Sequence, residues 1–189
     1  MKKYKRFLMW VGIILVVVIA ACALEYALYY RSHPMIKEKH IQTKGYLVFG
    51  TDFEMGEVVD VEIKGEELKY LFSDHEDAVQ GTIWMNGQNL FGEDMGEEQP
   101  GFYVAFHEDM PEMSFLSVGT SDAKCNYICI SKDWNTIICS LMVDESISET
   151  VDTPMLALLI VNAETAEEAK AQLEKAMMHP KMKQQMDKM

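Results

Sequence analysis

The chain has 189 residues, about half of them hydrophobic, which is enough for one ordinary domain. It contains 17 Lys or Arg and 30 Asp or Glu, and residues 1–44 hold eight of the basic and only two of the acidic residues. Beyond residue 44 the net charge is therefore −19. Such an acidic region repels DNA, RNA and anionic lipid, which argues against a nucleic-acid partner.

An apolar segment follows a basic start. Residues 2–6 (KKYKR) hold four positive charges, and the eighteen residues from Phe7 to Leu24 include no charge. As a helix they span about 27 Å, close to the ~30 Å hydrocarbon core of a bilayer. The dense N-terminal cluster favours an N-inside, C-outside orientation. We therefore expect residues 1–30 to attach the chain to the cell membrane and the remainder to lie outside the cytoplasm.

Three interpretations of this segment remain open: an uncleaved signal anchor, a lipoprotein signal and a cleaved signal peptide. The lipoprotein interpretation depends on Ile19-Ala20-Ala21-Cys22, which resembles the bacterial lipobox. If it holds, Cys22 is the candidate lipidation site and the first residue of the mature protein. The helical, apolar sequence after Cys22 favours the signal anchor, because lipoproteins usually continue with a polar tether. Both leading interpretations leave the domain tethered, with the membrane as a partner through the N-terminus.

Residues 31–44 are polar and basic and include Pro34, so we expect a short stalk. From residue 45 to residue 189, short apolar runs divided by Gly, Asn and Asp predict a β-rich domain. The first predicted hairpin covers residues 59–72, with Gly65-Glu66 as a two-residue type II′ turn. That register sets Ile63 opposite Leu68 and Val61 opposite Tyr70.

Two further hairpins are predicted. Asn86-Gly87 is the strongest short hairpin signal and sets Trp84 opposite Asn89. In residues 125–143, a tip at Asp133-Trp134 pairs Ile130 with Ile137 and Ile128 with Cys139. Both faces of this third hairpin are largely apolar, which predicts a place inside the sheet.

The remaining elements are three strands and one helix. Residues 102–106 and 115–119 are predicted strands, and residues 155–161 form a short apolar run that predicts a last, buried strand. From about residue 165, Thr165 and Glu168 match a helix capping box. Ala166, Ala169, Leu173 and Met177 then fall on one helix face, which we expect to pack on the sheet.

The cysteines of the third hairpin raise the question of a disulfide, since exported chains commonly oxidise their cysteines. Cys129 and Cys139 are the candidate pair. In the register given above they lie on opposite faces and cannot bridge, whereas a bulge or a longer turn would permit the bond. Cys125 and Cys129 lie too far apart along one strand. Buried free thiols are the other interpretation.

Acidic and methionine-rich segments are candidate metal ligands. Carboxylates and imidazoles are supplied by residues 74–77 (DHED), 92–101 and 107–109 (HED). Residues 177–189 combine His179 with several Met. Neither set follows a known template, so we assign no metal, no cofactor and no catalytic residue. Solvated acidic loops and a packing or partner-binding tail are the ordinary explanations, and we prefer them to metal sites.

The segments VDVEIKGEELKYLF and GTIWMNG resemble stretches of small, uncharacterised membrane-anchored or lipoprotein-like proteins of Gram-positive bacteria. The resemblance covers about thirty residues. It implies a bacterial surface location and no active site.

The sequence thus predicts a mainly β (α+β) fold: an N-terminal transmembrane helix, an antiparallel sheet or open barrel of about seven to nine strands, and a C-terminal helix on the sheet. We expect a tethered extracytoplasmic accessory or interaction module without catalytic activity, with a protein partner at the cell surface. A metal-binding surface protein and a cell-envelope hydrolase are the alternatives.

Overall fold

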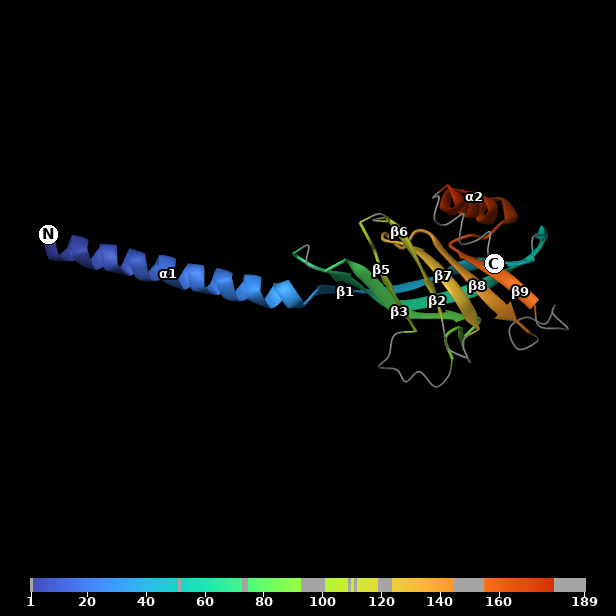
Figure 1. Ribbon diagram of the computed structural model, residues 1–189, viewed down its shortest axis with the longest axis horizontal. Coiled ribbons are helices and arrows are strands. Elements are labelled where there is room, and N and C mark those ends of the chain that lie inside the picture. The colour runs from blue at the N-terminus through green and yellow to red at the C-terminus, as the bar shows by residue number, and fades with distance from the viewer. Residues whose placement is uncertain are drawn as a thin grey trace. The chain divides into compact units, whose positions relative to one another are not determined.

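The computed structural model forms two compact units: residues 1–35 with 69–75, and residues 36–68 with 76–189. Figure 1 labels the helices and strands of both units. The residues that the structure describes are 2–50, 52–72, 75–92, 101–108, 110, 112–118, 124–144 and 155–178.

The first unit contains α1 (Lys2–Ser32), a single uninterrupted helix. It includes the whole predicted apolar segment, so the expected N-terminal helix is confirmed. The same unit contains residues 69–75, where the rings of Tyr70 and His75 lie 4.9 Å apart. Pro34 follows the helix by two residues, in keeping with its inability to continue one.

The second unit is built on one antiparallel sheet, which confirms the predicted fold class. The strands follow the order β4-β3-β2-β1-β9-β8-β7-β6, and β5 pairs with β3. The nine strands are β1 (Met35–Phe49), β2 (Asp52–Lys69), β3 (Ala78–Met85), β4 (Gln88–Asn89), β5 (Phe102–Ala105), β6 (Met113–Ser117), β7 (Cys125–Ser131), β8 (Ile137–Val143) and β9 (Met155–Val161).

The predicted stalk over residues 31–44 is wrong. The helix extends to Ser32, and most of the remaining residues form the first part of β1. Lys39, Ile41 and Thr43 are half-buried, whereas their neighbours along the strand are exposed. This alternation is hidden in the sequence because two of the three half-buried side chains, Lys39 and Thr43, are polar.

The predicted hairpin at Gly65-Glu66 is also wrong. β2 continues through both residues and pairs with β3, so that Val61 lies opposite Met85 and Ile63 opposite Ile83. Gly65 does not have the positive φ that a type II′ turn requires. It faces Gly81 instead, and a Cβ added to Gly65 would lie 2.6 Å from the indole of Trp134. The glycine permits a close approach and not a turn.

The other two predicted hairpins are confirmed. Asn86 and Gly87 have φ of 49° and 81°, as a type I′ turn requires, and Trp84 pairs with Asn89. In β7 and β8, Ile130 pairs with Ile137 and Ile128 with Cys139. Both strands lie inside the sheet, as expected.

The remaining strands also match, with one small shift. β5 and β9 fall on the predicted segments, whereas β6 begins two residues before the predicted start. β9 lies between β1 and β8, which explains why its sequence is almost wholly apolar.

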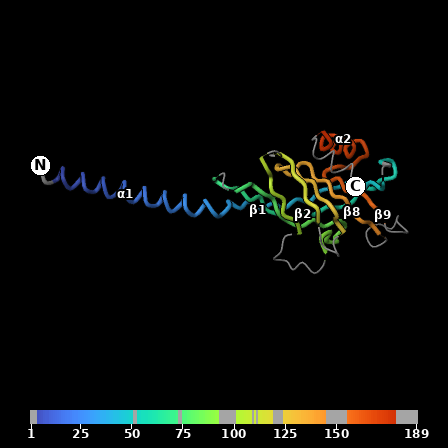
Figure 2. Tube along the Cα trace, in the orientation of Figure 1, coloured from blue at the N-terminus to red at the C-terminus, as the bar shows by residue number. Residues whose placement is uncertain are grey.

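The larger hydrophobic cluster, on one face of the sheet, joins strands that are far apart in the strand order. Ile63 of β2 and Ile83 of β3 share it with Ile128 of β7 and Leu159 of β9. Because one cluster contacts both halves of the sheet, the sheet must curl around it, as the trace in Figure 2 shows. The predicted open barrel describes this curled sheet.

The opposite face of the sheet carries α2 (Ala166–Met177). Ala169 and Ala176 of the helix are buried in a second cluster with Val48, Ile138 and Ile160. The capping box forms at its N-terminus: the Glu168 N–H donates to the Thr165 hydroxyl, and the Glu168 carboxylate accepts from the Glu164 N–H. The helix therefore packs as predicted, with Ala176 rather than Met177 as its last fully buried side chain.

Candidate functional site

The N-terminal helix is the first candidate. From Tyr4 to Ser32 it has a mean hydropathy of 2.9 in its most apolar window, and none of that window is buried. It is long and apolar enough to serve as a membrane anchor or as a signal sequence. Cys22 is exposed within it, and the helix continues ten residues beyond that cysteine to Ser32.

Two of the predicted hydrophilic clusters meet beside the end of β5. His107 Nδ1 lies 2.7 Å from the carboxylate of Glu76, and Lys132 Nζ donates to Asp77 at 2.6 Å. The sequence placed these carboxylates and the imidazole near strand ends but did not show that they pair. Each of these carboxylates is matched by a basic side chain, so the arrangement is a cluster of polar pairs at the surface.

The candidate metal ligands are only partly within the described residues. No group of three or more His, Cys, Asp or Glu there is arranged to hold a metal ion. The candidate ligands Asp74 and Asp109, the loop residues 93–100 and the tail residues 179–189 lie outside the described residues. Of the methionines at the C-terminus, Met177 and Met178 are described, and Met177 is half-buried whereas Met178 is strongly exposed.

The candidate cysteines lie on opposite faces of the sheet, as the predicted register requires. Cys139 belongs to the larger cluster inside the curl, whereas Cys129 belongs to the cluster under α2. Burial raises the pKa of Cys129 to about 12, which keeps its thiol protonated. The structure thus separates the two candidates and leaves Cys125, in the larger cluster, as the cysteine on the same face as Cys139.

A set of cross-strand ion pairs between β1 and β2 was not predicted. Lys39 pairs with Glu67 at 3.1 Å, and Lys44 pairs with Asp60. Glu62 lies 2.9 Å from His40 and 3.2 Å from Lys64. The hydrogen bonds from His40 and then from Lys64 lower the pKa of Glu62. The sequence contains the complementary charges, as basic residues in 37–44 and acidic residues in 60–67. The same charges also fit a polar stalk beside a hairpin, so they do not by themselves predict the pairing.

An apolar surface lies at the end of the sheet domain where β8 ends and β9 begins. Met142 pairs with Leu156, and Val143 pairs with Met155. Met142 and Leu156 are 43% and 47% exposed, and Met155 is 36% exposed. Side chains alternate along a strand, so Met142 and Leu156 share one face of the sheet, whereas Met155 lies on the other. We call Met142 and Leu156 the strand-end patch. Paired apolar residues at a strand end give no sequence signal that distinguishes them from a core.

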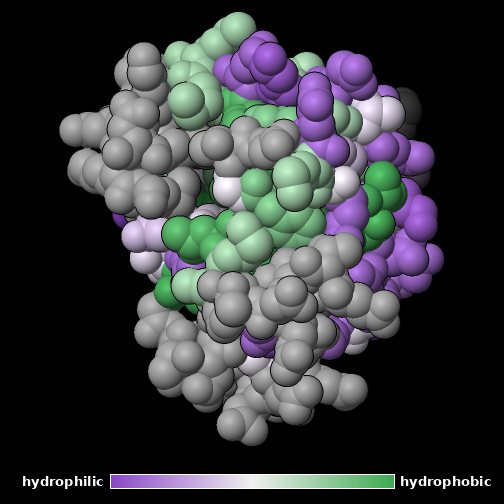
Figure 3. All heavy atoms as spheres, turned by 90° about the vertical axis from the view of Figure 1, so that its right-hand side faces the viewer, coloured by the Kyte–Doolittle hydropathy of each residue, from purple (hydrophilic) through white to green (hydrophobic). Residues whose placement is uncertain are grey.

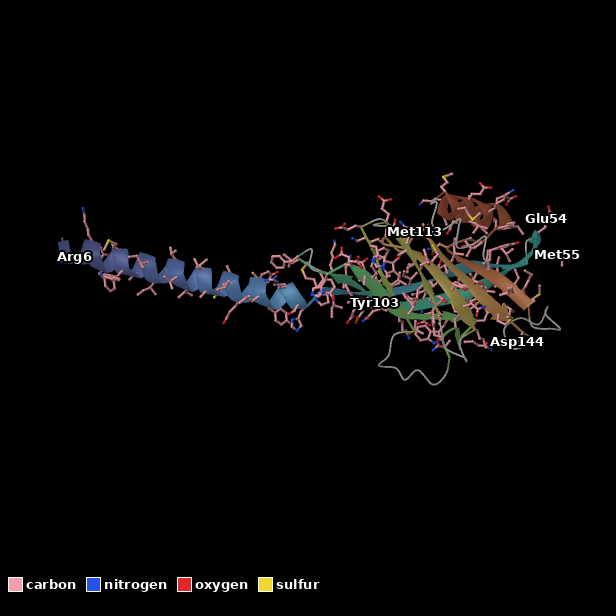
Figure 4. The ribbon with its side chains drawn as sticks, in the orientation of Figure 1. Arg6, Glu54, Met55, Tyr103, Met113 and Asp144 are labelled. Atoms are coloured by element: carbon pink, nitrogen blue, oxygen red, sulfur yellow. The ribbon has the colours of Figure 1, made fainter. Side chains whose placement is uncertain are left out.

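Figures 3 and 4 show this end of the domain. Met55, which is 70% exposed, and Asp144 lie at the same end (Figure 4). In the view onto that end, hydrophobic residues lie among hydrophilic ones and are not covered by them (Figure 3). The strand-end patch is therefore an exposed apolar surface, as contact surfaces commonly are.

Trp134, at the tip of the β7–β8 turn, fills the inside of the curled sheet. Its φ of 63° turns the chain, its ring centroid lies 6.3 Å from that of Phe102, and its side chain is buried. Asp133 stabilises the turn, since its carboxylate accepts from the hydroxyl of Ser131 and from both the N–H and the amide of Asn135. Burial raises the pKa of Asp133, but these hydrogen bonds outweigh it and lower the pKa overall.

Comparison with known proteins adds no relative. No protein-family model, no curated protein and no solved structure matches this chain.

Proposed function

We propose that the chain is a membrane-tethered interaction module without catalytic activity, whose sheet domain lies outside the cytoplasm. The observation that carries the proposal is α1: an apolar helix with its side chains exposed is stable in lipid and costly in water. An uncleaved anchor suits the helix better than a lipid on Cys22, because α1 passes through Cys22 without a break.

The distribution of charge supports the orientation. The basic residues 2–6 precede the apolar helix, and basic residues flanking a span are retained on the cytoplasmic side. The acidic region after residue 44 then lies on the opposite side, away from the anionic lipids of the cytoplasmic leaflet that would repel it.

The strand-end patch supports an interaction role. The interior of the sheet domain is filled by side chains such as Phe102, Ile128 and Trp134, each at most 2% exposed. Because these side chains occupy the interior, we expect a partner to bind on the outer surface of the domain. Met side chains adapt to partners of different shape, and one of the two residues in the patch is Met142.

Labelling with a membrane-impermeant maleimide tests the orientation. Gln42→Cys places a thiol on an exposed position of β1, and Lys5→Cys places one at the basic end of α1. We expect the first to react on intact cells and the second only after permeabilisation. Reaction of Lys5→Cys but not Gln42→Cys on intact cells would reverse the orientation and overturn the proposed location.

Photo-crosslinking on the same cells tests the contact surface. A photoreactive residue replaces Leu156 in the strand-end patch and, as a control, the exposed polar Gln42. A specific protein adduct at position 156 that is missing at position 42 supports the interaction module. Equal yields at both positions, or none at either, would argue against this patch as the contact surface.

A further inference from the structure

A β-bulge decides which cysteines of the third hairpin meet. In β7 and β8, Ile128 pairs with Cys139, but the register shifts between Cys125 and Tyr127, so that Cys125 pairs with Leu141. Side chains alternate along a regular strand, and Cys125 would then share the face of Cys129. The extra residue of the bulge moves Cys125 to the other face, where Cys139 lies.

The two thiols touch inside the larger cluster. Both residues are fully buried, and their side chains are in hydrogen-bonding contact. The Cys125 thiol donates to the carbonyl oxygen of Tyr127 at 3.3 Å, so its sulfur is available to accept from Cys139. That hydrogen bond and burial raise the pKa of Cys139 well above its ordinary value.

We propose that Cys125 and Cys139 form a disulfide in the exported protein, a pairing that rests on the proposed extracytoplasmic location. The oxidant is a dithiol–disulfide exchange partner, either a protein or a small-molecule disulfide. The thiolate of one cysteine attacks that disulfide, which forms a mixed disulfide and releases the first thiol of the oxidant. The thiolate of the other cysteine then attacks the mixed disulfide and releases the second thiol. The pair loses two protons and two electrons, an S–S bond forms, and the oxidant leaves as two thiols.

Burial determines when the bond forms. Neither thiol is accessible in the folded domain, and a protonated thiol is a poor nucleophile. The exchange therefore takes place while the hairpin is folding, and the folded sheet then protects the bond from reductants. Cys129 is excluded because it belongs to the cluster under α2, and Cys22 because it lies in the apolar helix that we propose as the membrane anchor.

Alkylation followed by peptide mapping tests the pairing. Full-length protein is made in cells that export it, quenched with acid, denatured and alkylated before any reduction. Trypsin cleaves after Lys124 and Lys132, which leaves Cys125 and Cys129 in one peptide and Cys139 in the next. We expect these two peptides to be linked until reduction, with Cys129 alkylated and Cys125 and Cys139 protected.

Two variants identify the partner. Cys129→Ala is expected to keep the link, whereas Cys125→Ala is expected to lose it and to add one alkylated thiol at Cys139. If a variant does not fold, fragmentation of the linked wild-type peptides assigns the bonded sulfur directly. A link through Cys129 would overturn the inference.

The orientation test separates the two proposals. If Gln42→Cys is labelled from outside while all three hairpin thiols are alkylated without reduction, the disulfide is refuted and the location stands. If Gln42→Cys is not labelled, the location fails, and refolding of the reduced full-length protein in detergent with oxidised glutathione decides the pairing. A refolded protein without the Cys125–Cys139 link overturns the inference, and one with the link supports it.

Discussion

Two regions of this chain are equally apolar but meet different surroundings. Along α1 the leucines, valines and isoleucines are exposed, whereas those of the larger cluster in the sheet domain have almost no exposed surface. Leu15 is 60% exposed and Leu159 is 0% exposed. The apolar side chains of the strands are buried by packing on one another, whereas those of the helix are exposed, which suits the membrane anchor that we propose.

The comparison shows that composition does not determine where an apolar residue contributes to stability. A buried leucine contributes through its neighbours in the fold, and in the proposed anchor a leucine of α1 contributes through transfer to the bilayer. Substitutions matched between the two regions should therefore separate domain stability from membrane attachment.

The largest expected effect comes from truncating a central residue of the core. Leu159 lies between Leu47 and Cys139, and Leu159→Ala should lower the free energy of unfolding of the sheet domain by about 2–5 kcal/mol. Leu15→Ala should leave it unchanged. Urea unfolding of the full-length protein in detergent, followed by tryptophan fluorescence, measures both. Equal losses in the two variants would contradict the separation of the regions.

A smaller effect is expected from adding one methyl group. The Cβ of Gly65→Ala would lie 2.5 Å from the carbonyl oxygen of Gln80 and 2.6 Å from the Trp134 ring. The resulting overpacking should cost about 1–3 kcal/mol. Gly12→Ala is the matched control, because nothing lies within 4 Å of its added Cβ. A neutral Gly65→Ala would show that the β2–β3 pair does not approach the Trp134 ring as closely as described.

The smallest effect concerns a charge in the turn that carries Trp134 into the interior. Asp133→Asn should lower domain stability by about 0.5–1.5 kcal/mol at neutral pH, because it weakens the hydrogen bonds to Ser131 and Asn135. The folded state lowers the pKa of Asp133, so its contribution is present above the ordinary carboxyl pKa. It is lost as the pH falls through the lowered value.

Stability curves of wild type and Asp133→Asn between neutral pH and pH 3 check this dependence. The difference between the two proteins should shrink below about pH 4. A difference that is constant over the whole range would show that the carboxylate charge does not stabilise the turn.

Much of the fold could be predicted because local signals were unambiguous. Asn86-Gly87 accepts positive φ, a tip at Asp133-Trp134 sets the register of residues 125–143, and Thr165 with Glu168 caps a helix. Less of the candidate sites could be predicted. The Glu76–His107 pair joins residues 31 positions apart, and no local preference reveals such a contact.

By itself, the sequence determined the apolar helix, the third hairpin and the capped C-terminal helix, because each depends on contacts between near neighbours in the chain. Only the tertiary structure decided that residues 35–44 form a strand, that Gly65 faces Gly81, and that Cys125 shares a face with Cys139. These features depend on which strand lies alongside. A glycine suits a tight turn and a close approach equally well, and one bulge residue reverses the face of the side chains beyond it.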